Sequence, residues 1–184
     1  MMPILWILIG IVFLLALIFI GYYNKFAILS NRADNSLSQI DVQLKKRADL
    51  VPNLIETVKG YAKHEKGIME KVTEARKAMV SAGDIVSKMK AGNALSGAIG
   101  KLFAIAENYP QLKANENFLQ LQQELAAIED KIAYSRQYYN DSILSYNTAC
   151  STFPGSFFAG IYGKQKKEYL QIPAAQRAVP KVSF

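Results

Sequence analysis

The residue types that most often carry enzymatic chemistry are scarce in this sequence and lie far apart. His64 is the single histidine and Cys150 the single cysteine among 184 residues. One imidazole cannot build a tetrahedral zinc site, and one thiol cannot form a disulfide within the chain. His64 falls on the polar flank of a helical pattern, so we interpret it as a surface residue. The sequence therefore predicts no metal site and no catalytic system based on histidine or cysteine.

Two other patterns look like functional motifs but do not meet the requirements of one. Glu129 and Asp130 are adjacent, and adjacent residues of a helix do not face each other, so we interpret the pair as solvated surface. GNALSGAIGK, residues 92–101, ends like a phosphate-binding loop. It lacks a glycine five residues before Gly100, and Leu102 replaces the Ser or Thr that would hold magnesium. We expect no catalytic residue and no cofactor, and we expect the glycines to allow close helix approach or to mark a flexible hairpin end.

A basic cluster, Lys45, Lys46 and Arg47, precedes Pro52 by about one turn of a helical pattern. Proline removes one hydrogen bond from a helix and crowds the carbonyl one turn back, so we expect Pro52 to bend the helix. Lys45 and Lys46 project from the flank, whereas Arg47 falls on the apolar stripe and must pair or reach water. We favour a curved helix with Arg47 paired to a carboxylate of the bundle. The alternative is a bent lever that presents the basic residues to a partner.

The net charge is +7, from 22 Lys and Arg against 15 Asp and Glu. Such an excess suits a domain beside an anionic bilayer, weak contact with nucleic acid, or simple solubility, which we favour. Lys and Glu are interspersed along the helical patterns and do not form the dense basic stripe of a nucleic-acid reader. We therefore expect no nucleic-acid partner.

The first element of the chain is the apolar stretch Ile4–Tyr23. It lies within residues 1–24, which carry no charged side chain. Twenty residues at 1.5 Å each give about 30 Å, the thickness of a hydrocarbon core. A cleaved signal peptide is the alternative, but it needs a basic n-region, a shorter apolar run and a small-residue cleavage site. None of these is present. We expect an uncleaved transmembrane helix, with aromatic residues near both ends; its residues include Ile4, Trp6, Phe13, Ile20, Tyr22 and Tyr23.

The orientation of this span is predicted from its flanks. Lys25 and Arg32 follow the span, and no Lys or Arg precedes it. The positive-inside rule then places the N-terminus outside and the remaining domain in the cytoplasm. The sequence thus predicts a single-pass membrane protein, and membrane lipid is its first expected partner.

Helical periodicity dominates the remainder. Apolar residues recur at steps of three and four from Leu37 to Met79, with two steps of seven, which predicts one long helix near 37–82. A weaker helix follows over 85–109. A second long helix over 116–152, capped by Asn115 or Asn117, carries a stripe that continues to Phe153. We therefore predict an all-α fold, a transmembrane helix followed by an antiparallel bundle with coiled-coil-like stripes.

The domain boundaries follow from these patterns. The segment 25–36 either extends the transmembrane helix or links it to the bundle. We expect the anchor at 1–24, the juxtamembrane segment at 25–36, the bundle at 37–163 and a C-terminal tail at 164–184, the last 13 residues of which are extended.

An aromatic and basic patch follows the second long helix. It contains Phe157, Phe158 and Tyr162, with Lys164, Lys166 and Lys167 directly after them. One interpretation is contact with the membrane interface or with a partner. The other, which we favour, is that the aromatic side chains cap the open end of the bundle.

Three stretches carry a family resemblance. DVQLKKRADLVPNLIETVKGYAKHE, AENYPQLKANENFLQLQQELAAIEDKIAYSRQYYNDSILSYN and the closing PKVSF resemble the two blocks and the C-terminus of the LemA family. Only about residues 83–100 lack a counterpart. The resemblance implies a bacterial membrane-anchored protein with long helices, and it supplies no catalytic residue. Some family members carry a lipidated cysteine after the apolar run, which places their domain outside. This chain has no such cysteine, so that alternative topology does not transfer.

Two functional hypotheses remain after an enzyme is set aside for lack of polar clusters with catalytic spacing. The first is a membrane-anchored scaffold or structural protein that forms homo-oligomers and organises partners or the bilayer. The second is a monomeric adaptor that binds a membrane protein, such as a membrane protease or a component of an envelope-stress system. The mass of the full-length protein separates the two.

Overall fold

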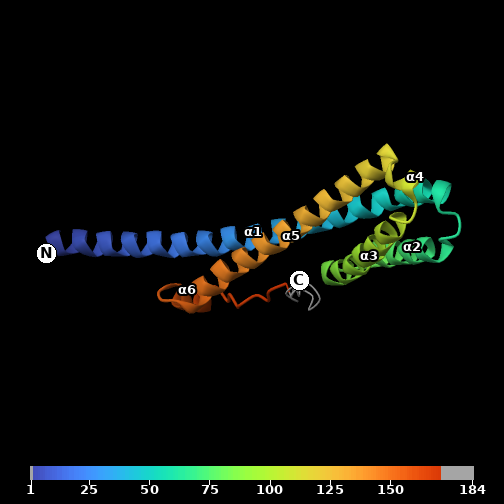
Figure 1. The fold of residues 1–184 in the computed structure, drawn as a ribbon. Helices are drawn as coiled ribbons and strands as arrows, with labels where there is room; N and C mark the ends of the chain where they lie inside the picture. Colours follow the sequence, from blue (N-terminus) through green and yellow to red (C-terminus); the bar gives the residue numbers. More distant parts are fainter. Residues whose placement is uncertain (1, 171–184) are drawn as a thin grey trace, which may run out of the picture. The chain divides into compact units, whose positions relative to one another are not determined.

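The computed structural model describes residues 2–170, and these form two compact units. Unit 1 contains residues 2–36 and 136–170, and unit 2 contains Leu37–Ser135. The described residues are helical with short connections and contain no strand, so the predicted all-α fold is confirmed (Figure 1). The predicted extended segment near the C-terminus lies outside the described residues. The helices are α1 Met2–Tyr61, α2 Lys66–Ser81, α3 Ile85–Ala106, α4 Pro110–Lys113, α5 Glu116–Ser151 and α6 Gly155–Ile161.

Helix α1 runs without interruption from the apolar stretch through the polar segment near residue 30. The sequence left open whether the chain breaks at this segment. Ser36 donates its hydroxyl hydrogen bond to the carbonyl of Arg32, 2.8 Å away and one turn back. A serine in this arrangement sits inside a helix and does not cap one. Residues 25–36 are therefore a helical extension of the apolar stretch.

The predicted single helix over 37–82 is wrong, because α1 ends at Tyr61 and α2 begins at Lys66. Ala62 is the last residue bonded to the α1 ladder, donating to the carbonyl of Val58 at 2.8 Å. Its side chain is buried. The seven-residue step in the stripe marks this turn, since the buried residue beyond it is Met69 and no longer follows the α1 register.

Unit 2 is built from four long helical segments that reverse direction at each turn (Figure 1). The α1 and α5 segments are antiparallel, because Asn115 bonds Tyr61 at one end of the unit while Arg47 bonds Glu129 further along. Apolar residues at helical spacing fill the interior. The fully buried ones are Ile40, Leu44, Val51, Leu54, Val72, Leu95, Leu102, Leu112 and Ile132.

The turns of unit 2 carry the expected capping chemistry. Asp84 precedes α3 and accepts a hydrogen bond from the amide of Ser87 at 2.9 Å. This bond to the charged form lowers the pKa of the Asp84 carboxyl. Asn115 accepts from the amide of Phe118 at 3.0 Å and caps α5, as one of the two predicted candidates.

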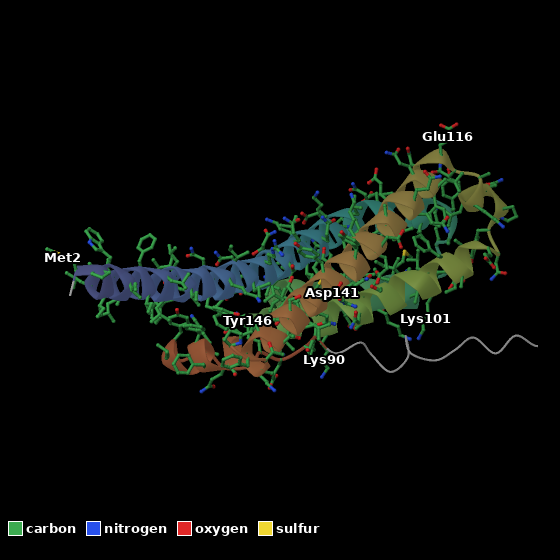
Figure 2. All side chains as sticks on the ribbon, turned by 90° about the vertical axis from the view of Figure 1, so that its left-hand side faces the viewer. Met2, Lys90, Lys101, Glu116, Asp141 and Tyr146 are labelled. Atoms are coloured by element: carbon green, nitrogen blue, oxygen red, sulfur yellow. The ribbon has the colours of Figure 1, made fainter. Side chains whose placement is uncertain are left out.

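Unit 1 contains the N-terminal part of α1, the C-terminal part of α5, α6 and the segment 164–170. Its core consists of Phe26, Leu29, Tyr146, Ala149 and Ala159. Side chains near Met2 project from all sides of α1 with no element packed beside them (Figure 2). Phe153 was expected on the buried stripe of α5, but this is wrong because the helix ends at Ser151 and Phe153 is 87% exposed.

Candidate functional site

Arg47 is the most unusual side chain of the unit 2 core, since it is 2% exposed and carries a permanent charge. Its guanidinium donates to the carboxylate of Glu129 and to the hydroxyl of Ser96. It also donates to the carbonyl of Gly92 at 3.2 Å. The favoured expectation that Arg47 pairs with a bundle carboxylate is therefore confirmed, and Arg47 is a core residue that no partner can reach.

Gly92 explains how α3 comes close enough to supply its carbonyl to Arg47. A Cβ at this position would lie 2.6 Å from Cδ2 of Leu44, a buried side chain of α1. The absence of a side chain thus permits the approach of the two helices. This confirms the close-approach interpretation for Gly92, whereas Gly97 and Gly100 face open space.

Pro52 lies inside α1, and its effect on the backbone is compensated by another helix. A proline has no amide hydrogen, so the carbonyl of Ala48, four residues earlier, loses its helical donor. Nε of Arg76 in α2 donates to that carbonyl at 2.7 Å. Sequence analysis found the proline but missed Arg76, because no local pattern shows which distant donor meets the freed carbonyl.

A groove of about 270 Å³ opens on unit 2 beside this arrangement. Leu44, Ala48, Met79 and Val80 supply its apolar surface. Asp41, Asp49, Lys45, Arg76 and Lys88 surround it, and Lys88 bonds Asp41 at 2.8 Å. The structure thus places Lys45 at a surface of mixed charge, while Lys46 is exposed and lines none of the grooves described.

The aromatic residues after α5 are divided between two environments. Phe158 stacks on Tyr22 with ring centroids 4.7 Å apart, and Tyr162 meets Phe19 edge-to-face at 4.9 Å. These contacts pack α6 against the end of the apolar stretch of α1. Phe157 is 62% exposed and takes no part in that packing. Phe158 and Tyr162 also pack on the core of unit 1 around Tyr146 and Ala149, and the cap for the bundle end stays a prediction.

The three lysines after α6 also differ. Lys167 donates to the hydroxyl of Ser30 at 2.8 Å and lies over the ring of Tyr146 at 5.3 Å. Lys164 and Lys166 are exposed. Lys167 therefore holds the chain against unit 1, while the other two lysines are free to meet a charged surface.

Two asparagines of α5 hold the segment 164–170 in place, and sequence analysis missed both. The side-chain amide of Asn147 donates to the carbonyl of Lys167 and accepts from its amide, both at 2.9 Å. Asn140 makes the same pair of bonds to Leu170, at 3.1 and 2.9 Å. The spacing of seven residues, two helical turns, puts both on one face. This spacing is the signal that could have identified them.

Burial raises the pKa of several groups in unit 1. It raises the pKa of the Cys150 thiol, and nearby Lys166 and Lys164 only partly offset it. Burial also raises the pKa of Tyr139 and of Tyr146. A thiol with a raised pKa is a poor nucleophile at neutral pH. Among residues 2–170, no three His, Cys, Asp or Glu side chains gather where they could hold a metal.

The apolar stretch of α1 has the length and composition of a membrane-spanning helix, and none of it is buried in the structure. By length and composition it is the one such helix among the described residues. This helix thus supports association with a membrane.

Comparison with known proteins gives consistent results. The LemA family profile matches residues 36–184. Magnetosome protein MamQ from Magnetospirillum gryphiswaldense is 30% identical over 173 residues, which cover 80% of this chain and 64% of that protein. Magnetosome protein MamQ 2 from Paramagnetospirillum magneticum is 26% identical over 175 residues, covering 81% and 64%. Protein LemA from Metamycoplasma hominis is 26% identical over 137 residues, covering 74% and 63%. The matches span just under two thirds of each relative's length, and none of these relatives is named as an enzyme.

Proposed function

Because the chain belongs to the LemA family, we propose that it is a non-enzymatic, membrane-anchored scaffold that self-associates and organises partners or the bilayer. The observation that carries self-association is an exposed apolar pair at the α2–α3 turn of unit 2. Val80 is 59% exposed and Val86 is 63% exposed. Val80 lies in the last turn of α2 and Val86 in the first turn of α3, on either side of the same short connection.

A second copy of the chain is the occupant that this surface favours. A two-fold interface presents the same patch on both subunits, so the patch must complement itself. The groove beside Val80 carries both charge signs, with Asp41 and Asp49 facing Lys45 and Lys88. The apolar stripes are largely buried within one chain, so self-association rests on this surface and not on the stripes.

The test is disulfide crosslinking of the full-length protein in membranes. In a Cys150→Ser background, Val86→Cys should form a dimer on mild oxidation, because we place the two-fold axis beside residue 86, where its two copies meet. Lys101→Cys is the matched control, an exposed position on the same helix α3 (Figure 2). Equal crosslinking at both positions would indicate random collision and would sink the proposed surface.

The second candidate is a monomeric adaptor whose Val80–Val86 surface binds another membrane protein. The same apolar and mixed-charge surface supports it. The mass of the full-length protein in a mild detergent separates the two: a single-chain mass at concentrations where the crosslink forms would favour the adaptor.

We also propose a single pass through the bacterial cell membrane, with the N-terminus outside and both units' polar residues in the cytoplasm. Lys25 and Arg32 directly after the apolar stretch support this orientation. In the Cys150→Ser background, Lys166→Cys should resist a membrane-impermeant thiol reagent in intact cells and react after lysis. Labelling in intact cells would place the domain outside, as in lipidated members of the family.

A further inference from the structure

We propose that α6 is a second membrane contact, an interfacial helix that inserts one aromatic face into the bilayer beside the apolar stretch of α1. This inference goes beyond scaffolding, and it does not depend on self-association. It rests on the two faces of α6, on the depth at which α6 contacts α1, and on the charge that follows it.

The two faces of α6 differ in what covers them. Gly155, Phe158, Ala159 and Tyr162 face the protein. Phe153, Phe157 and Ile161 follow a spacing of four residues, the spacing of one helical face. They are 87%, 62% and 52% exposed. The seven residues of α6 contain no charge, so this face has no reason to remain in water.

Gly155 shows how tightly the inner face is seated. A Cβ at this residue would lie 2.2 Å from the carbonyl oxygen of Ala149 and 3.5 Å from Cε1 of Tyr22. A backbone atom cannot move aside as a flexible side chain can. The position of α6 against α1 and α5 is therefore closely fixed within unit 1.

The contacts with α1 set the depth of α6. The hydroxyl of Tyr162 donates to the carbonyl of Phe19 at 2.5 Å, and Phe19 lies four residues inside the end of the apolar stretch at Tyr23. At 1.5 Å per residue, this level is about 6 Å inside the hydrocarbon boundary. Amphipathic interfacial helices bury their apolar face about 5–10 Å into that boundary. A bilayer around α1 therefore surrounds the outer face of α6 as well.

The backbone of α6 is hydrogen-bonded, as backbone at this depth in a bilayer needs to be. Amides near its ends are bonded internally: Ser156 to Thr152 at 2.8 Å, Tyr162 to Phe158 at 2.9 Å and Lys164 to Ala159 at 2.8 Å. Unpaired backbone groups are costly where water is scarce. Because these amides are paired, α6 avoids most of that cost.

The charge around α6 favours an anionic lipid surface. The described parts of unit 1 contain six Lys or Arg residues and three Asp or Glu residues. Lys25, Lys164 and Lys166 are exposed close to the end of the apolar stretch or directly after α6. Basic residues at this level attract anionic headgroups.

The test places single tryptophans in the full-length protein in vesicles with anionic lipid. Trp6 is the one tryptophan of the chain, so Trp6→Phe provides a dark background. Phe157→Trp reports on the outer face of α6. Tyr134→Trp is the control, an aromatic position 69% exposed in unit 2. The tryptophan at 157 should emit at shorter wavelength than the control because it leaves water. Lipids brominated in the upper acyl chain should quench it at least about twofold more than the control, as expected for interfacial insertion.

Two outcomes would overturn the inference. One is equal quenching of both tryptophans by aqueous acrylamide, with no effect of brominated lipid. The other is a blue shift at 157 without bromolipid quenching, which would mean that protein and not lipid covers this face. Lys164→Gln with Lys166→Gln should reduce the quenching at 157 in anionic vesicles and leave it unchanged in zwitterionic ones. A loss in both would contradict the role given to the lysines.

Discussion

The two residues of the Arg47–Glu129 ion pair differ in how far they are buried. Arg47 is 2% exposed, but Glu129 is 41% exposed. Removing the carboxylate takes a charged acceptor away from a cation in the core, whereas removing the cation leaves a carboxylate that water can reach. The pair is therefore a structural requirement of unit 2 and not a site that a partner reads.

The first prediction follows from this asymmetry. Glu129→Ala should lower the free energy of unfolding by about 3 kcal/mol, because it removes a carboxylate that is paired with a buried charge. Arg47→Met should cost less than half of that. Chemical denaturation of the full-length protein in detergent, followed by circular dichroism, measures both. Glu124→Ala, an exposed carboxylate of the same helix, should have little effect; a larger cost for Arg47→Met than for Glu129→Ala would contradict this account.

The second prediction concerns the carbonyl that Pro52 leaves without its helical donor. Arg76→Ala should destabilise unit 2 by about 2 kcal/mol, the loss of a charge-assisted hydrogen bond. In a Pro52→Ala background the same change should cost clearly less, because the new amide at residue 52 donates to Ala48 instead. A double-mutant cycle on unfolding free energy should give a coupling of at least about 0.5 kcal/mol.

The contact between Arg76 and Ala48 also limits the effect of Pro52→Ala alone on the free energy of unfolding. Proline in a helix interior is disfavoured by about 3 kcal/mol relative to alanine. Because Arg76 already satisfies the freed carbonyl, the gain from Pro52→Ala should be smaller than that. Independent effects of the two substitutions would mean that the contact between Arg76 and Ala48 carries no stabilisation.

At the scale of elements, the segment 164–170 depends on side-chain amides and not on a helix or sheet. Asn147→Ala removes both hydrogen bonds to Lys167 and should release the segment, since water replaces them at little cost. Tryptic cleavage after Lys166 and Lys167 should become faster, as should hydrogen exchange at the Lys167 amide. Ser151→Ala, an exposed change on the same helix, should leave both rates unchanged. Unaltered cleavage in Asn147→Ala would mean that the other contacts of the segment, those of Lys167, Asn140 and Tyr139, hold it without Asn147.

The elements show how far sequence reasoning reaches in this protein. Period and caps predicted the long helix near 116–152 and the cap at Asn115, because each is set by neighbours in the sequence. The break after Tyr61 was missed because no proline or strong cap marks it; the reversal is set by packing of Met69 and Val72. Likewise, Arg47 could be recognised as a residue needing a partner, but its choice of Glu129 depends on how two distant helices align.

At the scale of the molecule, the two units should respond differently to alkaline pH. Tyr139, Tyr146 and Cys150 all lie in unit 1 and all have raised pKa values, mainly through burial. The folded state therefore holds these protons more tightly than the unfolded state does. The stabilisation is complete below the ordinary pKa values of 9.0 for cysteine and 10.0 for tyrosine, and it is lost as pH rises through the folded values.

The corresponding measurement compares the units within one protein. As the pH rises above about 9, hydrogen exchange in residues 136–151, corrected for the intrinsic effect of pH, should accelerate before exchange in residues 116–135 of the same helix. Cys150→Ala should remove the earliest part of this change. Simultaneous loosening of both stretches would mean that the buried tyrosines do not control unit 1.

The division of unit 1 between the two ends of the chain has a consequence for biosynthesis. Unit 2 is continuous in the sequence, whereas the contact between Tyr162 and Phe19 joins residues 143 positions apart. At about 5–20 residues per second, the apolar stretch is synthesised on the order of 10 s before its α6 partner. Ribosome-stalled chains from which residue 135 has just left the exit tunnel should therefore already contain a protease-resistant unit 2, while Tyr22 and Phe26 still lack their contacts with α6.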